Sequence, residues 1–195
     1  MKEGDVSFHA KTRPQWRKWL ENNHEKEKKV WLIIYHKDSD TKSIYYADAV
    51  EEALCFGWID SAPRKRDSES FFLSFSPRKP KSVWSKLNKE RVASLISEGM
   101  MTPAGMQKII QAKKTGAWNA LNKIDKMIIP GDLQKALSSN KEAMKNFSAF
   151  PPSAKKIILS WIDNARRTET RVNRIKETIR LAAMNIRANQ YKPKE

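Results

Sequence analysis

Four residues in one short stretch have the chemistry of a catalytic pocket. Glu52 and Cys55 are three positions apart on a predicted helix, so they share one of its faces. Trp58 and Asp60 follow where that helix gives way to a predicted strand. A carboxylate beside a thiol suits nucleophilic catalysis if the thiol is accessible and partly ionised. We favour the competing structural interpretation for Cys55, because cysteine is among the most buried residue types.

A second group surrounds a proline-bounded linker at residues 77–82. The two prolines stiffen this linker because each holds the preceding residue extended. Arg78 and Lys79 lie next to Trp84, and Asn88 follows four residues later. A guanidinium, an ammonium and an indole together suit an anionic group, and a nucleic-acid base could also stack on the indole. The alternative is a solvated turn beside a core tryptophan. We take this group as the preferred candidate binding site.

The last predicted helix carries a third group of charged residues. Arg167, Arg171 and Arg174 fall within about 60° of one another on one flank of its apolar stripe. Such a flank could form a basic groove for an anionic partner. The alternative is a face of ion pairs, because Glu169 and Glu177 are near enough in sequence to pair with these arginines.

The hydrophobic spacing that positions these groups predicts an α+β fold. Apolar residues recur at helical spacing in several segments, and two apolar runs are typical of strands. The first run is nearly continuous, which is typical of a strand buried on both faces. A charged turn is predicted before the second strand, and Ser82 is the predicted N-cap of the helix after the linker. The predicted helices include residues 13–23, 46–58 and 83–97, the strands residues 29–37 and 71–75, and the turn residues 64–70. We expect a small antiparallel sheet packed by helices, followed by a C-terminal helical segment.

Composition narrows the classes of partner. The chain has 195 residues, of which 39% are hydrophobic and 31% charged, with a net charge of +16. We divide it into an α+β domain at 1–127 and a basic helical segment at 128–195. Each carries a net charge of +8, although the second is about half as long. Apolar runs fall far short of the roughly 20 residues that span a bilayer, so no transmembrane segment is expected. A strongly basic protein attracts polyanions such as nucleic acid or an anionic surface.

The cysteine content and the absence of metal-ligand spacings bear on location and cofactors. The single cysteine forms no internal disulfide, and the N-terminal residues lack the apolar core of a secretory signal, so a cytoplasmic location is expected. Spacings typical of zinc ligands are absent from the sequence. We therefore predict neither a metal site nor another cofactor. The sequence indicates no oligomeric state.

Three separated blocks of sequence resemble the bacteriocin-protection family, also called YdeI/OmpD-associated proteins. The blocks are Tyr46–Ser61, Phe75–Ser85 and Pro152–Ile175. The resemblance extends from about Trp16 to about Ala183. It implies a link to bacterial resistance to cationic antimicrobial peptides, and it brings no agreed catalytic residues with it.

The first functional hypothesis is a non-enzymatic binding protein for an anionic partner. The alternatives are a nucleic-acid-binding protein and, third, an enzyme that uses Glu52, Cys55 and Asp60. Direct capture of a cationic peptide is disfavoured, because a protein with a charge of +16 repels it at long range. Competition for the anionic surface that the peptide attacks, or an earlier regulatory role, fits the charge better.

Overall fold

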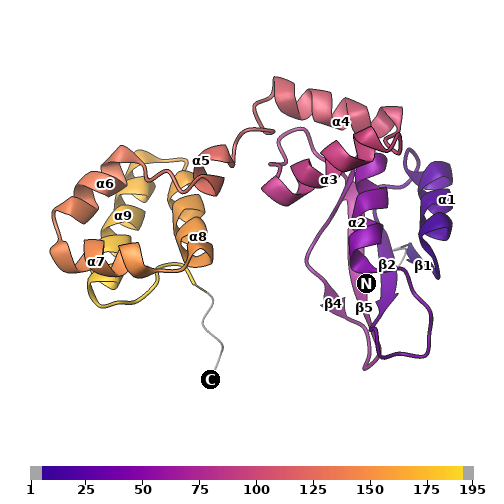
Figure 1. Cartoon of the computed structure of the whole chain (residues 1–195), viewed down its shortest axis with the longest axis horizontal. Helices are drawn as coiled ribbons and strands as arrows, with labels where there is room; N and C mark the ends of the chain where they lie inside the picture. The colour runs from indigo at the N-terminus through magenta and orange to yellow at the C-terminus, as the bar shows by residue number, and fades with distance from the viewer. Residues whose placement is uncertain (1–5, 191–195) are drawn as a thin grey trace. The chain divides into compact units, whose positions relative to one another are not determined.

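The chain folds as two compact units that meet in sequence between Ala120 and Leu121 (Figure 1). The computed structural model describes residues 6–190. The first unit combines a sheet with helices, and the second is helical. The predicted α+β class with a C-terminal helical stretch is therefore confirmed.

The strands of the first unit that lie in the described range form one mixed sheet. Their order is β1-β2-β5-β3, and β4 pairs with β5. Strands β2 and β5 are antiparallel from the pair Val30 and Phe75 to the pair Tyr35 and Ser70. Strand β1 runs parallel to β2, so the sheet is mostly antiparallel. The bounds are β1 Ser7–His9, β2 Val30–Tyr35, β3 Trp58–Asp60, β4 Arg64–Lys65 and β5 Ser70–Pro77.

Alternation along β2 separates two faces of this sheet. Successive side chains of a strand point to opposite sides. Val30, Leu32 and Ile34 belong to the hydrophobic core together with side chains of the helices. Trp31 and Ile33 do not belong to that core. Trp31 is nevertheless buried, so the predicted burial on both faces is confirmed at this residue, whereas Ile33 and Tyr35 on the same second face are half-buried.

The helices of the first unit begin at identifiable caps. In α1, Thr12 is the N-cap, and a proline sits in the first turn where its missing N–H is harmless. Trp16 is buried, donates from its indole nitrogen to the carbonyl oxygen of Ala49, and stacks on Trp19 with centroids 5.2 Å apart. The bounds are α1 Arg13–Asn23, α2 Tyr46–Cys55, α3 Lys86–Ser97 and α4 Pro103–Lys114.

Several boundaries differ from the prediction. Helix α2 ends at Cys55, three residues before the predicted end, because Trp58 begins β3 and pairs with Pro77 of β5. Helix α3 begins at Lys86 with Ser85 as its N-cap, three residues later than expected, because Trp84 stays extended and buried against the core. The segment predicted as a charged turn contains β4, whose Arg64 pairs with Phe72 of β5. Local charge indicated a turn throughout, whereas the first two residues pair with the following strand in a short hairpin.

The end of α2 is held tightly against the start of α4. Both the backbone N–H and the hydroxyl of Thr102 donate to the carbonyl oxygen of Cys55, at 3.2 and 2.6 Å. A Cβ atom on Gly105 would lie 2.2 Å from that oxygen. Only glycine therefore permits this approach of the two helices.

The second unit packs its helices around α9. Figure 1 shows α9 next to α6, α7 and α8, and each of these contacts it. Its core includes the fully buried Leu133, Leu137, Ile158 and Ile162. Within the described residues of both units, no helix has the length and apolar character needed to cross a membrane. The bounds are α5 Asn122–Asp125, α6 Gly131–Ser138, α7 Lys141–Ala149, α8 Pro152–Asp163 and α9 Thr168–Ala183.

Candidate functional site

The linker after β5 carries a buried guanidinium. Arg78 is only 2% exposed, and its Cζ lies 3.8 Å from the centroid of the Trp84 ring. Its Nη2 donates to the carbonyl oxygen of Val83. Its Nε and Nη1, and the indole nitrogen of Trp84, are buried and have no acceptor among residues 6–190. Three buried N–H donor groups in one place are therefore short of an acceptor.

The electrostatics of Arg78 reflect this burial. Removal from water lowers the pKa of the guanidinium to about 10, and Asp60 offsets the shift only in part. Within the described range, no carboxylate lies within 4 Å of Arg78. A buried charge without a partner is costly, and buried donors normally find acceptors. The site has the chemistry to accept an anion.

The other two residues predicted for this site lie differently. Lys79 is exposed on the linker. The backbone N–H of Asn88 donates to Ser85 Oγ at 3.3 Å, and its side-chain oxygen accepts from Arg91 at 3.1 Å. Asn88 therefore stabilises the first turn of α3, and the structure gives it no contact with the guanidinium of Arg78.

Glu52 of the predicted catalytic group is held in ion pairs. It is 1% exposed, and its two oxygens accept from Arg13 Nε at 2.6 Å and Arg17 Nη1 at 2.8 Å. Arg13 also pairs with Glu51 at 2.9 Å. A carboxylate held in this way balances two cations in the packing of α1 on α2, and it has no oxygen directed to a substrate.

The remaining members of that group do not form an accessible pocket. Cys55 is fully buried, and burial, with a contribution from Glu52, raises the pKa of its thiol to about 11. Trp58 is a core residue whose indole donates to a backbone oxygen. Asp60 accepts from the hydroxyl of Tyr46 at 2.9 Å. A protonated, buried thiol is a poor nucleophile, so the geometry favours the structural interpretation of Cys55.

The arginines of the last helix join elements within the second unit. Arg171 Nε and Nη2 donate to the two oxygens of Asp132, at 2.6 and 3.0 Å. Arg174 donates to the carbonyl oxygen of Trp161, in the last turn of α8, where carbonyls lack helical partners. Arg167 is exposed just before α9. Two of the three arginines therefore hold helices together, which differs from the predicted open groove.

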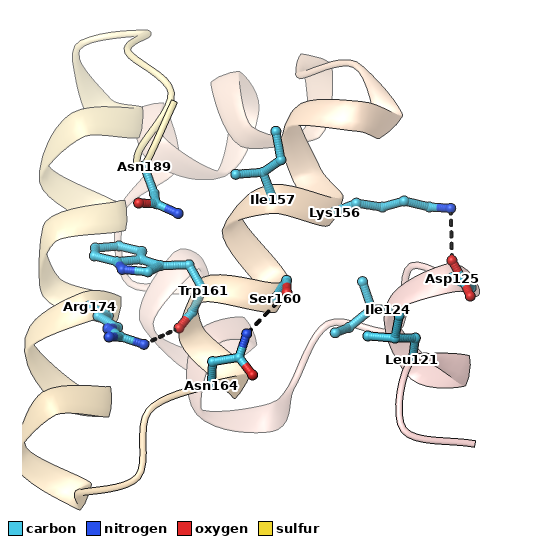
Figure 2. Close-up of a pocket in the computed structure, with 10 residues that line it drawn as sticks. All are labelled: Leu121, Ile124, Asp125, Lys156, Ile157, Ser160, Trp161, Asn164, Arg174 and Asn189. Carbon is cyan, nitrogen blue, oxygen red and sulfur yellow. Dashed lines mark hydrogen bonds and ion pairs between the residues drawn. The ribbon is translucent and has the colours of Figure 1, made fainter. Parts of the chain in front are cut away.

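Arg174 also lines a pocket of about 470 Å³ in the second unit. Figure 2 shows side chains of α8 between Arg174 on one side and Leu121 and Ile124 on the other. Lys156 points away to Asp125, with 3.0 Å between Nζ and Oδ1. The residues contributed by α8 are Lys156, Ile157, Ser160 and Trp161, and Asn164 follows at its C-cap. An apolar hollow with one guanidinium suits an apolar group that carries an acceptor. The sequence analysis missed it because α5 is a single short turn.

The sequence analysis also missed a cluster on the second face of the sheet, opposite the helix-packed core. Trp31 and Tyr35 of β2 point there, and Lys29 and Arg64 lie within 5.0 Å of the Trp31 ring. The signal was present as alternation in β2 with a lysine just before it. It was hidden because both sets of alternating positions in this strand are apolar or aromatic.

Comparisons with known proteins match two separate segments, one within each of the two units. Residues 8–108, just over half of the chain, match the model of the family described as Domain of unknown function (DUF8412). The chain belongs to this family. Residues 126–185 match the model described as Bacteriocin-protection, YdeI or OmpD-Associated. That match confirms the resemblance for this segment, whereas the resemblance was expected from about Trp16 onwards. No curated protein and no solved structure matches the chain.

The two matched segments contain different candidate sites. The DUF8412 segment contains the Arg78–Trp84 site and the second face of the sheet. The YdeI/OmpD-associated segment contains the helices that form most of the pocket beside Arg174. The bacteriocin-protection description therefore concerns a segment of the second unit, and the DUF8412 description names no activity for the first.

Proposed function

We propose that this protein is a non-enzymatic binding protein for an anionic partner, which it receives at Arg78 and Trp84. The observation that carries the proposal is the set of buried donors without acceptors, Arg78 Nε and Nη1 and Trp84 Nε1. An anion with several oxygens, such as a phosphate or a carboxylate, would satisfy these donors and neutralise the buried guanidinium.

The surroundings of the site support an anionic partner. Lys79 and Lys81 are exposed on the same linker, and the whole chain carries a net charge of +16. Such a charge accelerates encounter with polyanions and makes their binding sensitive to salt. Arg167 is a further exposed cation, in the second unit, which the sequence analysis predicted as a binding residue.

Thermal unfolding with inorganic phosphate tests the proposal. A ligand that binds only the folded state raises Tm with its concentration, so phosphate should stabilise the protein more than chloride at equal ionic strength. Trp84→Phe keeps an aromatic ring but removes the indole N–H donor, and Arg78→Met removes the charge. Both variants should show a smaller Tm response to phosphate. An equal response in wild type and both variants would exclude this site.

The stability of Arg78→Met gives a second, independent readout. Replacing a buried charge that lacks a partner with an apolar side chain is often neutral or stabilising. We expect Arg78→Met to raise the free energy of unfolding by about 1–3 kcal/mol while losing the phosphate response. Urea denaturation measures this change. A large destabilisation would show that Arg78 serves the fold through contacts of its own.

The description of the second segment suggests how binding would serve a cell. We propose that the protein protects against cationic peptides by competing for the anionic surfaces that they attack, in a reducing compartment such as the cytoplasm. Repulsion between like charges makes direct capture of such a peptide unfavourable. Survival of cells expressing wild type or Arg78→Met under a cationic peptide tests the role. Equal survival would contradict it, and cell fractionation checks the location.

A further inference from the structure

The second face of the sheet in the first unit, opposite the helix-packed core, carries a row of aromatic rings. Trp31 and Tyr35 of β2 share it with Phe72 of β5, because Phe72 pairs with Ile33 between them. The Trp31 and Phe72 rings meet edge to face with centroids 6.0 Å apart. None of the three belongs to the hydrophobic core that the helices cover. We call Trp31, Tyr35 and Phe72 the aromatic face.

Two cations lie over the first of these rings. Lys29 Nζ is 3.9 Å from the centroid of Trp31, and Arg64 Cζ is 5.0 Å from it. Neither cation has a carboxylate within 4 Å among residues 6–190. Trp31 is 3% exposed, whereas Arg64 is exposed. A ligand that approaches here therefore meets positive charge that no acid of the described chain neutralises.

A third cation lies over the other end of the aromatic face. Arg66 Cζ is 5.8 Å from the centroid of Tyr35 and 5.9 Å from that of Phe72. Its Nη1 donates to the hydroxyl of Tyr35 at 3.1 Å, and Asp67 is its ion-pair partner at 3.5 Å. Tyr35 and Phe72 are half-buried and so keep part of their surface exposed.

We propose that the aromatic face binds single-stranded nucleic acid. Phosphates complement the charges of Lys29, Arg64 and Arg66. Unpaired bases stack on the half-exposed rings of Tyr35 and Phe72 and on guanidinium planes, whereas the buried Trp31 supports the cations above it. A duplex offers phosphates but keeps its bases stacked within the helix, so it makes fewer of these contacts. The surface shares no residue with the Arg78–Trp84 site, and the inference therefore goes beyond the function proposed above and stands independently of it.

Fluorescence anisotropy of a labelled single-stranded oligothymidylate tests the proposal. We expect binding that weakens steeply as salt rises, because phosphate contacts release counterions. A duplex of equal length should bind more weakly. Phe72→Leu removes one stacking ring but keeps an apolar side chain, and it should weaken binding by about 5- to 100-fold. Circular dichroism confirms that the variant folds.

Matched variants distinguish binding at the aromatic face from a general effect of positive charge and from an effect of the opposite face of the sheet. Phe71→Leu changes the neighbouring ring, which belongs to the opposite, core-packed face, and should leave the affinity unchanged. Lys29→Gln should lower the slope of log affinity against log salt by about one, because it removes one phosphate contact. Lys114→Gln removes an equal charge at the end of α4 and should not change the slope.

Two results overturn the proposal. The first is equal affinity of Phe72→Leu and Phe71→Leu, or equal slopes for Lys29→Gln and Lys114→Gln. The second is binding of the duplex, or of phosphatidylglycerol vesicles, as tightly as the single strand. If Phe72→Leu does not fold, Arg64→Gln at an exposed position provides the same test. Arg78→Met distinguishes the two proposals, because it should retain oligothymidylate binding even where the phosphate response is lost.

Discussion

The state of the Cys55 thiol is open to a direct chemical test. Cys55 is the single cysteine of the chain, so a thiol reagent reports on this residue alone. Burial raises its pKa from 9.0 to about 11. At neutral pH the ionised fraction therefore falls by about 100-fold, since each pKa unit is a factor of ten. Because the residue is fully buried, a reagent must also wait for local opening.

We predict that native Cys55 reacts with Ellman's reagent at pH 7 at least about 100-fold more slowly than in the urea-unfolded chain. The assay follows the thionitrobenzoate released in each state, with Cys55→Ala as the blank. A native rate within about tenfold of the unfolded rate would refute the reasoning. The thiol would then be accessible and partly ionised, and the catalytic use of Glu52, Cys55 and Asp60 would become the better interpretation.

The same pKa shift carries a consequence for stability at alkaline pH. The unfolded thiol loses its proton above pH 9, whereas the folded thiol keeps it until about pH 11. The folded state therefore binds more protons in this window, and the free energy of unfolding falls as pH rises. Relative to Cys55→Ala, the loss should reach about 2–3 kcal/mol by pH 11. Urea denaturation of both proteins across pH 8–11 measures the difference.

Three further predictions concern packing and charge. Gly105→Ala should lower the free energy of unfolding by about 1–3 kcal/mol, because its Cβ would meet a backbone oxygen at 2.2 Å. Gly131→Ala is the control, because open space surrounds that position, and it should not destabilise the protein. Equal urea midpoints for the two variants would contradict this prediction. Glu52→Gln should cost about 3 kcal/mol by leaving two arginines underpaired, and a midpoint unchanged in urea would argue against the ion pairs. The hydrogen bond from Arg171 lowers the pKa of Asp132, so the stabilisation from this carboxylate is present at neutral pH and lost as pH falls through the acidic range. In Asp132→Asn, the decrease of Tm with falling pH should therefore be smaller than in wild type.

Elements whose signal lies within one run of residues were predictable. The proline and apolar spacing of α1 indicated its bounds, and the strand character of β2 was evident from its β-branched and aromatic residues. Strand β4 was not predictable in the same way, because two charged residues carry no strand signal. The partner strand around Phe72 was predicted, but nothing in Arg64 and Lys65 themselves indicates that they pair with it. The parallel pairing of β1 with β2 is likewise a tertiary property.

In the candidate sites, too, the features set by local sequence were predictable and those set by tertiary packing were not. The approach of Arg78 to Trp84 follows from a stiff linker only six residues long, so spacing predicted it. Their burial was not predicted, because it depends on packing with distant segments. The roles of Arg171 and Arg174 depend on where α8 ends, since its last carbonyls attract their guanidinium groups. Helical periodicity places a side chain on a flank but does not show which backbone groups lie opposite.

The stack of Trp16 on Trp19 gives the first unit an optical signature of its own. Two indoles held 5.2 Å apart at 15° couple their electronic transitions, and Trp84 and Trp118, 5.0 Å apart, form a second such pair in the same unit. This unit should therefore show an exciton signal in circular dichroism that is lost when its packing is lost. The second unit contains one tryptophan, Trp161, whose emission can be removed by substitution with phenylalanine. The loss of structure in each half of the chain is therefore separable by spectroscopy on the intact protein, without labels.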